Sequence, residues 1–135
     1  MTTYVIDKLY MLTMEHGERR HATYAANEIH DALFDEILEA LQNEKLYRLE
    51  MEISQEDKSM SVFYESGRFH IGVVDLYNDT NYYYNNGSGD TTLLDVDGEM
   101  FETRMVGTDR NLLWKAIREF AQQGTLSAEI AWIVD

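Results

Sequence analysis

Cysteine and proline are both absent from this sequence of 135 residues, and each absence narrows the structural choices. Without cysteine, the chain forms no disulfide and offers no thiolate for an iron–sulfur cluster, a zinc site or a thiol nucleophile. A cysteine-free composition suits the reducing cytosol. Without proline, helices and strands must end at glycine, asparagine, aspartate or serine instead.

Long apolar runs and a basic leader are missing as well. The first eight residues, Met1 to Lys8, have neither the charge nor the apolar stretch of a signal peptide. No apolar run approaches the ~18 residues that a membrane-spanning helix needs. We therefore expect a cytoplasmic protein without a membrane segment.

Positive charge is scarce. Eleven Lys and Arg residues stand against 25 Asp and Glu, which gives a net charge of −14 at pH 7. Such a surface repels phosphate backbones and anionic lipids, so we expect neither nucleic-acid nor membrane binding. A basic partner would be attracted to it. The competing interpretation is that the acidity serves solubility alone.

Most of the chain has strand-like patterns joined by short polar turns. The clearest strand is Leu46 to Ser54, in which Tyr47 is expected on the same face as Leu49 and Met51. Residues 16–21 are expected to form a polar loop. The other expected strands are 4–14, 60–64, 69–74, 91–96, 99–106 and 128–134. Because short turns cannot form parallel crossovers, these strands should pair antiparallel.

Two segments have a helical period instead. Apolar side chains recur every three or four positions across residues 27–43, where Asn27 or Thr23 is the candidate N-cap, and again across 109–123. The sequence therefore predicts an α+β fold, in which residues 1–135 form a single domain. It consists of one curved antiparallel sheet of about six to eight strands with two helices packed on it.

No residue pattern points to catalysis. The four histidines do not have a standard metal-binding spacing. The acidic stretch 95–99 fails as a calcium loop, because Leu93 and Arg104 would occupy ligand positions. The Gly87–Gly89 segment lacks the lysine of a phosphate-binding loop. We expect no catalytic residue, no metal and no cofactor. The histidines are His16, His21, His30 and His70.

The acids are concentrated in two stretches of the chain. Residues 28–57 contain ten acids against Lys45 and Arg48, and residues 75–102 contain seven acids with no Lys or Arg. The second stretch also carries tyrosines, which are enriched at interface hot spots. This composition favours a surface for a basic protein partner. The alternative is a hairpin whose tyrosines pack on the sheet while its acids are merely solvated.

The C-terminal part, about residues 82–134, resembles the first-numbered Imm family of bacterial polymorphic-toxin immunity proteins. The resemblance lies in Tyr82-Tyr83-Tyr84-Asn85-Asn86-Gly87, in the hairpin signal Asp97-Gly98, and in Phe120, Gly124 and Trp132. These last three match a late helix ending in Phe-x-x-x-Gly and a following strand with a terminal tryptophan. Thr125-Leu126-Ser127 stands where the family pattern has a proline.

The resemblance implies a non-catalytic immunity protein, or antitoxin. Such proteins protect bacteria from toxins delivered by contact-dependent inhibition or type VI secretion systems, many of them nucleases or deaminases. We expect a cognate, basic toxin domain as partner, neutralised by covering its active site or substrate groove. Tyrosines would anchor the complex and acids would steer it. The expected partner-binding residues are Asp79, Tyr82, Tyr83, Tyr84, Asp90, Asp95, Asp97 and Glu99.

Two other functions remain open at this point. One is a small regulatory or adaptor domain that binds another protein; a toxin gene directly upstream would argue against it. The other is a small-molecule binder or enzyme, which a pocket lined by His70 and a carboxylate would favour. Self-association to a homodimer is also left open.

Overall fold

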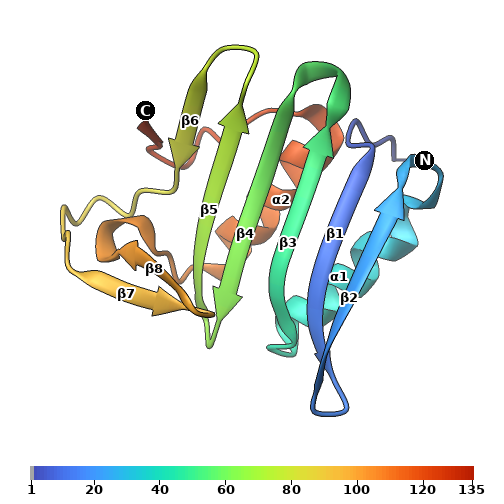
Figure 1. Cartoon of the computed structure of the whole chain (residues 1–135), viewed down its shortest axis with the longest axis horizontal. Coiled ribbons are helices and arrows are strands. Elements are labelled where there is room, and N and C mark those ends of the chain that lie inside the picture. The colour runs from blue at the N-terminus through green and yellow to red at the C-terminus, as the bar shows by residue number, and fades with distance from the viewer. Residues whose placement is uncertain (1) are drawn as a thin grey trace.

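Seven strands form one antiparallel sheet in the order β2-β1-β3-β4-β5-β6-β9 in the computed structural model, which describes residues 2–135 (Figure 1). The remaining two strands form a separate hairpin. The expected α+β fold with a single main sheet is confirmed. The strands are β1 (Lys8–Glu15), β2 (Glu18–Ala25), β3 (Leu46–Ile53), β4 (Lys58–Glu65), β5 (Arg68–Asp75), β6 (Thr80–Tyr83), β7 (Leu93–Val96), β8 (Glu99–Glu102) and β9 (Ile133–Val134).

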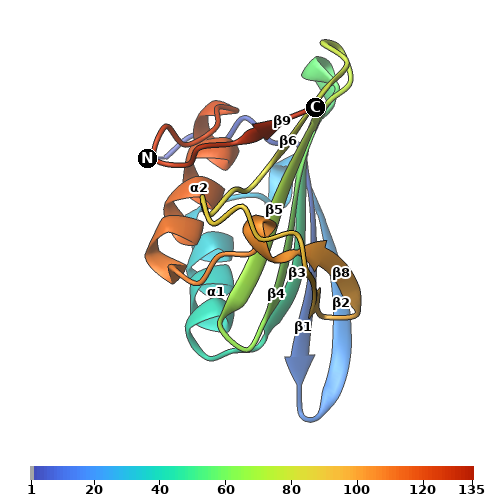
Figure 2. The same ribbon diagram turned by 90° about the vertical axis from the view of Figure 1, so that its left-hand side faces the viewer.

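Both α-helices, α1 (Asp31–Gln42) and α2 (Arg110–Gln123), cover the same face of the sheet (Figure 2). Their apolar stripes meet the inward side chains of the strands in one core. Phe34 on α1 and Phe120 on α2 are completely buried there. The sheet therefore has one face that packs the core and one face free of helices.

The first helix begins later than the sequence suggests. Its N-cap is His30, whose Nδ1 accepts a hydrogen bond from the Leu33 N–H, in place of the expected Asn27 or Thr23. The short 3₁₀ turn η1 (Ala26–Glu28) precedes it. Residues 26–28 of this turn fall within the sequence segment that has helical spacing, but they are not part of the α-helix.

The expected polar loop at 16–21 is wrong. Only His16 and Gly17 turn, with positive φ angles of 52° and 79°, and the chain then pairs along the whole of β1 as strand β2. An edge strand that is exposed on both faces has no apolar alternation, so the pattern that reveals other strands is missing.

A bulge changes which side chain of β3 reaches the core. Leu12 pairs with Arg48 but the next residue of β1, Thr13, pairs with Leu46, so Tyr47 is the extra residue. Leu46 is buried and Tyr47 stays half-exposed, contrary to the expectation from strict alternation.

The C-terminal segment is mostly not a strand. Only Ile133 and Val134 pair, with Tyr83 and Tyr82 of β6, so the strand expected over 128–134 is much shorter. Ile130 is buried, whereas Val134 is exposed. Because β9 pairs with β6, β6 is not an edge strand of the sheet.

The strands expected at 91–96 and 99–106 form the β7–β8 hairpin, outside the main sheet. The second of them ends at Glu102 and continues as the 3₁₀ turn η3 (Thr103–Met105). Figure 2 shows this hairpin on the helix-free face of the sheet.

Candidate partner-binding surface

The β7–β8 hairpin is fastened to the sheet by aromatic packing. The Phe101 ring lies 4.1 Å from the His70 ring of β5, centroid to centroid, and 5.3 Å from the Phe63 ring of β4. Val96 on β7 is fully buried, outside the main core. The hairpin thus builds a second, smaller apolar layer on the helix-free face, which turns part of that face into a fixed platform.

His70 has a structural role in this layer. Its Nδ1 lies 2.8 Å from the Met105 carbonyl oxygen, which can only accept, so Nδ1 carries the proton. Burial lowers the pKa of the imidazole below its usual value, although the bond to Met105 opposes that shift. Within residues 2–135, no carboxylate is hydrogen-bonded to His70.

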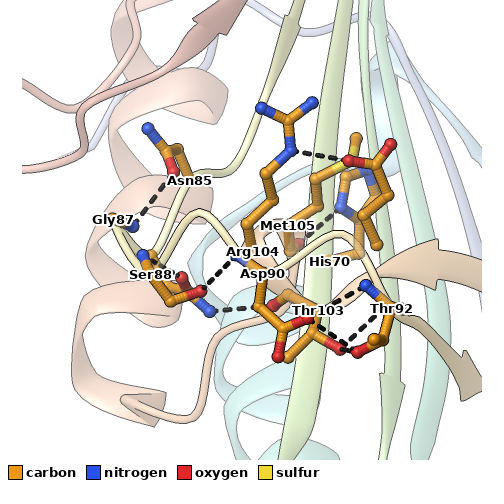
Figure 3. A network of polar contacts seen from close by, with 11 residues as sticks. His70, Asn85, Gly87, Ser88, Asp90, Thr92, Thr103, Arg104 and Met105 are labelled. Carbon is orange, nitrogen blue, oxygen red and sulfur yellow. Dashed lines mark hydrogen bonds and ion pairs between the residues drawn. The ribbon is translucent and has the colours of Figure 1, made fainter.

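The 85–92 loop, which connects β6 to β7, is held against η3 by a dense polar network (Figure 3). Asn86 donates from its side chain to the Thr103 and Val106 carbonyls, at 2.8 and 2.9 Å. The Arg104 N–H donates to the Asp90 carbonyl at 2.8 Å. Despite its glycines, this loop is a defined surface, and its one acid, Asp90, has a fixed position.

Four of the expected acids are exposed and have no ion pair with Lys or Arg among the described residues: Asp79, Asp90, Asp95 and Glu99. They lie in the β5–β6 turn, in the 85–92 loop and on the hairpin. These segments follow one side of the molecule, on the left of Figure 1. The Thr92 N–H and hydroxyl both donate to Asp90, which lowers the pKa of this carboxyl. This side of the molecule stays negative at neutral pH.

Asp97 differs from these four acids. Its side chain is only 2% exposed and lies 2.6 Å from the guanidinium of Arg19 on β2. Its backbone N–H donates to Glu65 at 2.9 Å. Asp97 therefore holds the hairpin turn onto the sheet, in place of the exposed steering role expected from the sequence.

The three expected anchor tyrosines do not form one surface. Tyr82 packs partly against the main core, whereas Tyr83 faces the other way, 6.1 Å from the His70 ring. Tyr84 is 7% exposed and meets Phe69 edge-on at 4.9 Å, so it is a core residue. Strand alternation explains the split, because successive side chains point to opposite faces. Only Tyr83 is available on the helix-free face.

The structure reveals exposed apolar side chains that were not among the expected partner-binding residues, although Tyr77 belongs to the tyrosine-rich stretch noted in the sequence. Leu76 and Tyr77, in the β5–β6 turn, are 70% and 82% exposed, and Leu93 and Met100 on the hairpin are 64% and 55% exposed. All four belong to the stretch 75–102 that lacks Lys and Arg. For Leu76, Leu93 and Met100 the signal in the sequence is an apolar residue placed among acids and turn formers; for Tyr77 it is also the tyrosine content of the stretch.

A hollow of the surface lies elsewhere. About 820 Å³ in volume, it separates α1 from β1 and β2, and its rim includes Glu28, Glu36 and Glu39 opposite Arg20 and Lys45. None of the expected partner-binding residues lines it. Over residues 2–135, no three His, Asp or Glu side chains are grouped so that they could hold a metal ion. In the same residues, neither helix has the length and apolar content to cross a membrane.

The residues that carry the family resemblance have clear structural roles. Gly124 ends α2 with a φ of 73°, and its N–H donates to the Phe120 carbonyl at 2.9 Å. A Cβ at Gly124 would lie 2.9 Å from Ile53, so a side chain would not fit without a shift. The Trp132 indole N–H donates to the Ser127 carbonyl at 3.0 Å. Phe120, Gly124 and Trp132 thus have roles in shaping the fold.

Comparison with known proteins gives a family but no function. None of the curated proteins and none of the solved structures compared with this chain matches it. A family model described as "Family of unknown function (DUF6911)" matches residues 7–130. This match includes both helices and all strands of the main sheet except β9. The chain therefore belongs to the DUF6911 family.

Proposed function

We propose that this chain is a non-catalytic immunity protein that binds and neutralises a basic toxin domain of the nuclease or deaminase type. The main support is unneutralised charge. Of the 25 carboxylate side chains, seven form ion pairs with Lys or Arg within residues 2–135. The exposed acids Asp79, Asp90, Asp95 and Glu99 follow one side of the molecule without such a partner.

Carboxylates held in this way can imitate a phosphate backbone. A nuclease or deaminase needs a basic surface to hold its nucleic acid, and an acidic protein is steered to that surface at a high rate. The hydrogen bonds of the 85–92 loop fix Asp90 and its neighbours before binding, so little conformational entropy is lost on association. Once bound, the bulk of the fold would block the substrate groove.

The immunity assignment itself rests on the resemblance of residues 82–134 to the first-numbered Imm family. DUF6911 has no stated function, so it neither adds to nor opposes this assignment. An adaptor domain would use the same acidic surface with a different partner. Identification of the partner is therefore the observation that separates the two functions.

The test is co-purification of the tagged chain with the product of the gene directly upstream, expressed together, followed by assay of that product for nuclease and deaminase activity on nucleic acid. We expect a complex with a basic domain whose dissociation constant rises steeply with salt, and loss of toxin activity at one equivalent. A neighbouring gene product that neither binds nor is inhibited would refute the proposal. Recovery of a non-toxic partner alone would favour the adaptor function instead.

A further inference from the structure

The β5–β6 turn, residues 76–79, presents two large apolar side chains to solvent. Leu76 is 70% exposed and Tyr77 82%, the highest values among the large apolar residues described. The turn lies beside the 3₁₀ turn η2 (Ser54–Glu56), and Figure 2 shows both turns projecting beyond the ends of the two helices. We name Asp57 and residues 76–79 the projecting tip.

The tip is held in one conformation. The buried Asp75 carboxylate accepts hydrogen bonds from the N–H and the side-chain amide of Asn78, at 3.2 and 2.8 Å. The Leu76 N–H donates to the Asp57 carbonyl at 2.9 Å, which ties the two turns together. The exposure of Leu76 and Tyr77 is thus built into a fixed turn, and binding would cost little ordering entropy.

Nothing within residues 2–135 uses these two side chains. No hydrogen bond joins the Tyr77 hydroxyl to another described residue, and neither side chain belongs to the core or packs against it. A fixed, solvent-exposed tyrosine is a typical interface hot spot, because it buries a large area once a partner pocket covers it, and the adjacent Leu76 adds apolar area to the same contact. Leu76 and Tyr77 are therefore suited to insert into a pocket of a protein partner.

The charge around the tip selects the partner. Asp57 and Asp79 are exposed on it, and Glu56 is adjacent in η2. The residue after Asp57 is a cation, Lys58, but its side chain is 18% exposed, donates to the Gly124 carbonyl and is paired with Glu56. A second copy of this chain would bring like charges together, and an anionic membrane would also repel the tip. A basic protein surface is complementary.

We propose that Leu76 and Tyr77 insert into an apolar pocket of the basic toxin domain, while Asp57 and Asp79 pair with cations at the rim of that pocket. This inference rests on the proposed function and identifies the two residues that anchor the complex with the toxin domain. It places the anchor at the opposite end of β5 from the hairpin. The exposed hairpin residues Leu93 and Met100 fit less well, because neither is of the Trp, Tyr or Arg type that is enriched at hot spots. Glu102, opposite Leu93 in the hairpin, is already paired with Arg104.

The experiment measures association and dissociation rates of the purified neighbouring toxin domain with four forms of this chain. They are the wild type, Tyr77→Ala, Leu76→Ala and the matched control Leu93→Ala, which removes an equally exposed apolar side chain at the other end of β5. All four should have the same circular dichroism and melting temperature, because the altered side chains are solvent-exposed. Tyr77→Ala should raise the dissociation constant about 30-fold or more, mainly through faster dissociation.

The outcomes separate the two proposals. If the wild type binds and Tyr77→Ala binds within twofold of it, the anchor is wrong while the proposed function stands. If Leu93→Ala weakens binding more than Tyr77→Ala, the anchor belongs to the hairpin, and the tip proposal is also overturned. If the wild type does not bind at all, both proposals fail. A dimer of this chain that Tyr77→Ala dissociates in sedimentation would assign the tip to self-association and overturn the toxin anchor.

Discussion

The guanidinium of Arg19 on edge strand β2 lies 2.6 Å from the buried carboxylate of Asp97 in the β7–β8 turn, 78 positions further along the chain. This ion pair joins the turn of the hairpin to one edge of the sheet. Strand β8 of the hairpin is also fastened to the sheet, because the Phe101 ring stacks on the His70 ring of β5. The hairpin is therefore held both at its turn and along β8. The acidic segment between them is presented on a rigid support.

Replacing Arg19 should release the hairpin turn. Arg19→Ala leaves the Asp97 carboxylate, 2% exposed, without its cation, and we expect a loss of about 2 kcal/mol in the free energy of unfolding. Hydrogen exchange of residues 93–102 should rise at the same time. The matched control is Arg20→Ala, which breaks the exposed pair with Glu15 and should cost less than about 0.5 kcal/mol. Equal effects of the two variants in urea unfolding would contradict this role for Asp97.

Acidification should weaken the fold through His70. Its pKa is lowered in the folded state, so below the ordinary value of 6.5 the unfolded chain binds more protons than the folded one. The contribution of His70 to stability is thus complete above pH 6.5 and falls as the pH drops from there towards the folded pKa. His70→Phe keeps the stacking on Phe101 and removes this titration. The difference between wild type and His70→Phe in urea unfolding should therefore change between pH 7 and pH 5; a constant difference would argue against a neutral, buried imidazole.

Gly107 should tolerate no side chain. A Cβ there would lie 2.7 Å from ring atoms of both Phe69 and Tyr84, which are themselves packed edge-on. Gly107→Ala should destabilise the fold by about 3 kcal/mol, because two buried rings must move. Gly72→Ala is the control, since its Cβ would meet nothing closer than 3.6 Å. We expect that change to be neutral or to stabilise by about 0.5 kcal/mol. Thermal unfolding of both variants measures the contrast.

Neutralising the exposed acids should slow toxin capture. The triple variant Asp79→Asn, Asp95→Asn and Glu99→Gln keeps the shape of each side chain and removes three charges. At low salt we expect the association rate constant to fall about tenfold with little change in dissociation.

The matched control for that variant removes three charges from the exposed face of α1, by Asp35→Asn, Glu36→Gln and Glu39→Gln. These acids are also without ion pairs among the described residues. If both triple variants slow association equally, net charge alone governs the rate, and the side of the molecule that carries β6 and the hairpin has no special role.

The parts of the fold with strong periodicity could be predicted from the sequence. Both helices and the central strands follow from apolar residues that recur at helical or strand spacing, because one face of each must be buried. Strand β2 escaped prediction because neither of its faces is buried. The bulge at Tyr47 and the late start of α1 at His30 depend on contacts with neighbouring elements, which local spacing does not encode.

The candidate site was predicted less completely than the fold. The acidic stretch 75–102 could be identified from charge alone, and four of its acids are exposed as expected. Tyr84 and Asp97 are buried instead, because alternation along β6 and pairing with Arg19 assign them to the interior. Leu76 and Tyr77 were not among the expected partner-binding residues, since only a folded turn shows whether an apolar side chain is covered.

The sequence by itself determined the charge of this protein, its lack of thiol chemistry and the alternation that makes one antiparallel sheet with two helices. These are properties of residue type and of spacing over a few positions. Only the tertiary structure decided that residues 93–102 leave the main sheet and pack on its helix-free face, and which acids and tyrosines face solvent. Those outcomes depend on partners such as Arg19, His70 and Asp57, brought together from distant parts of the chain. Burial is a property of the folded whole, so no short window of sequence contains it.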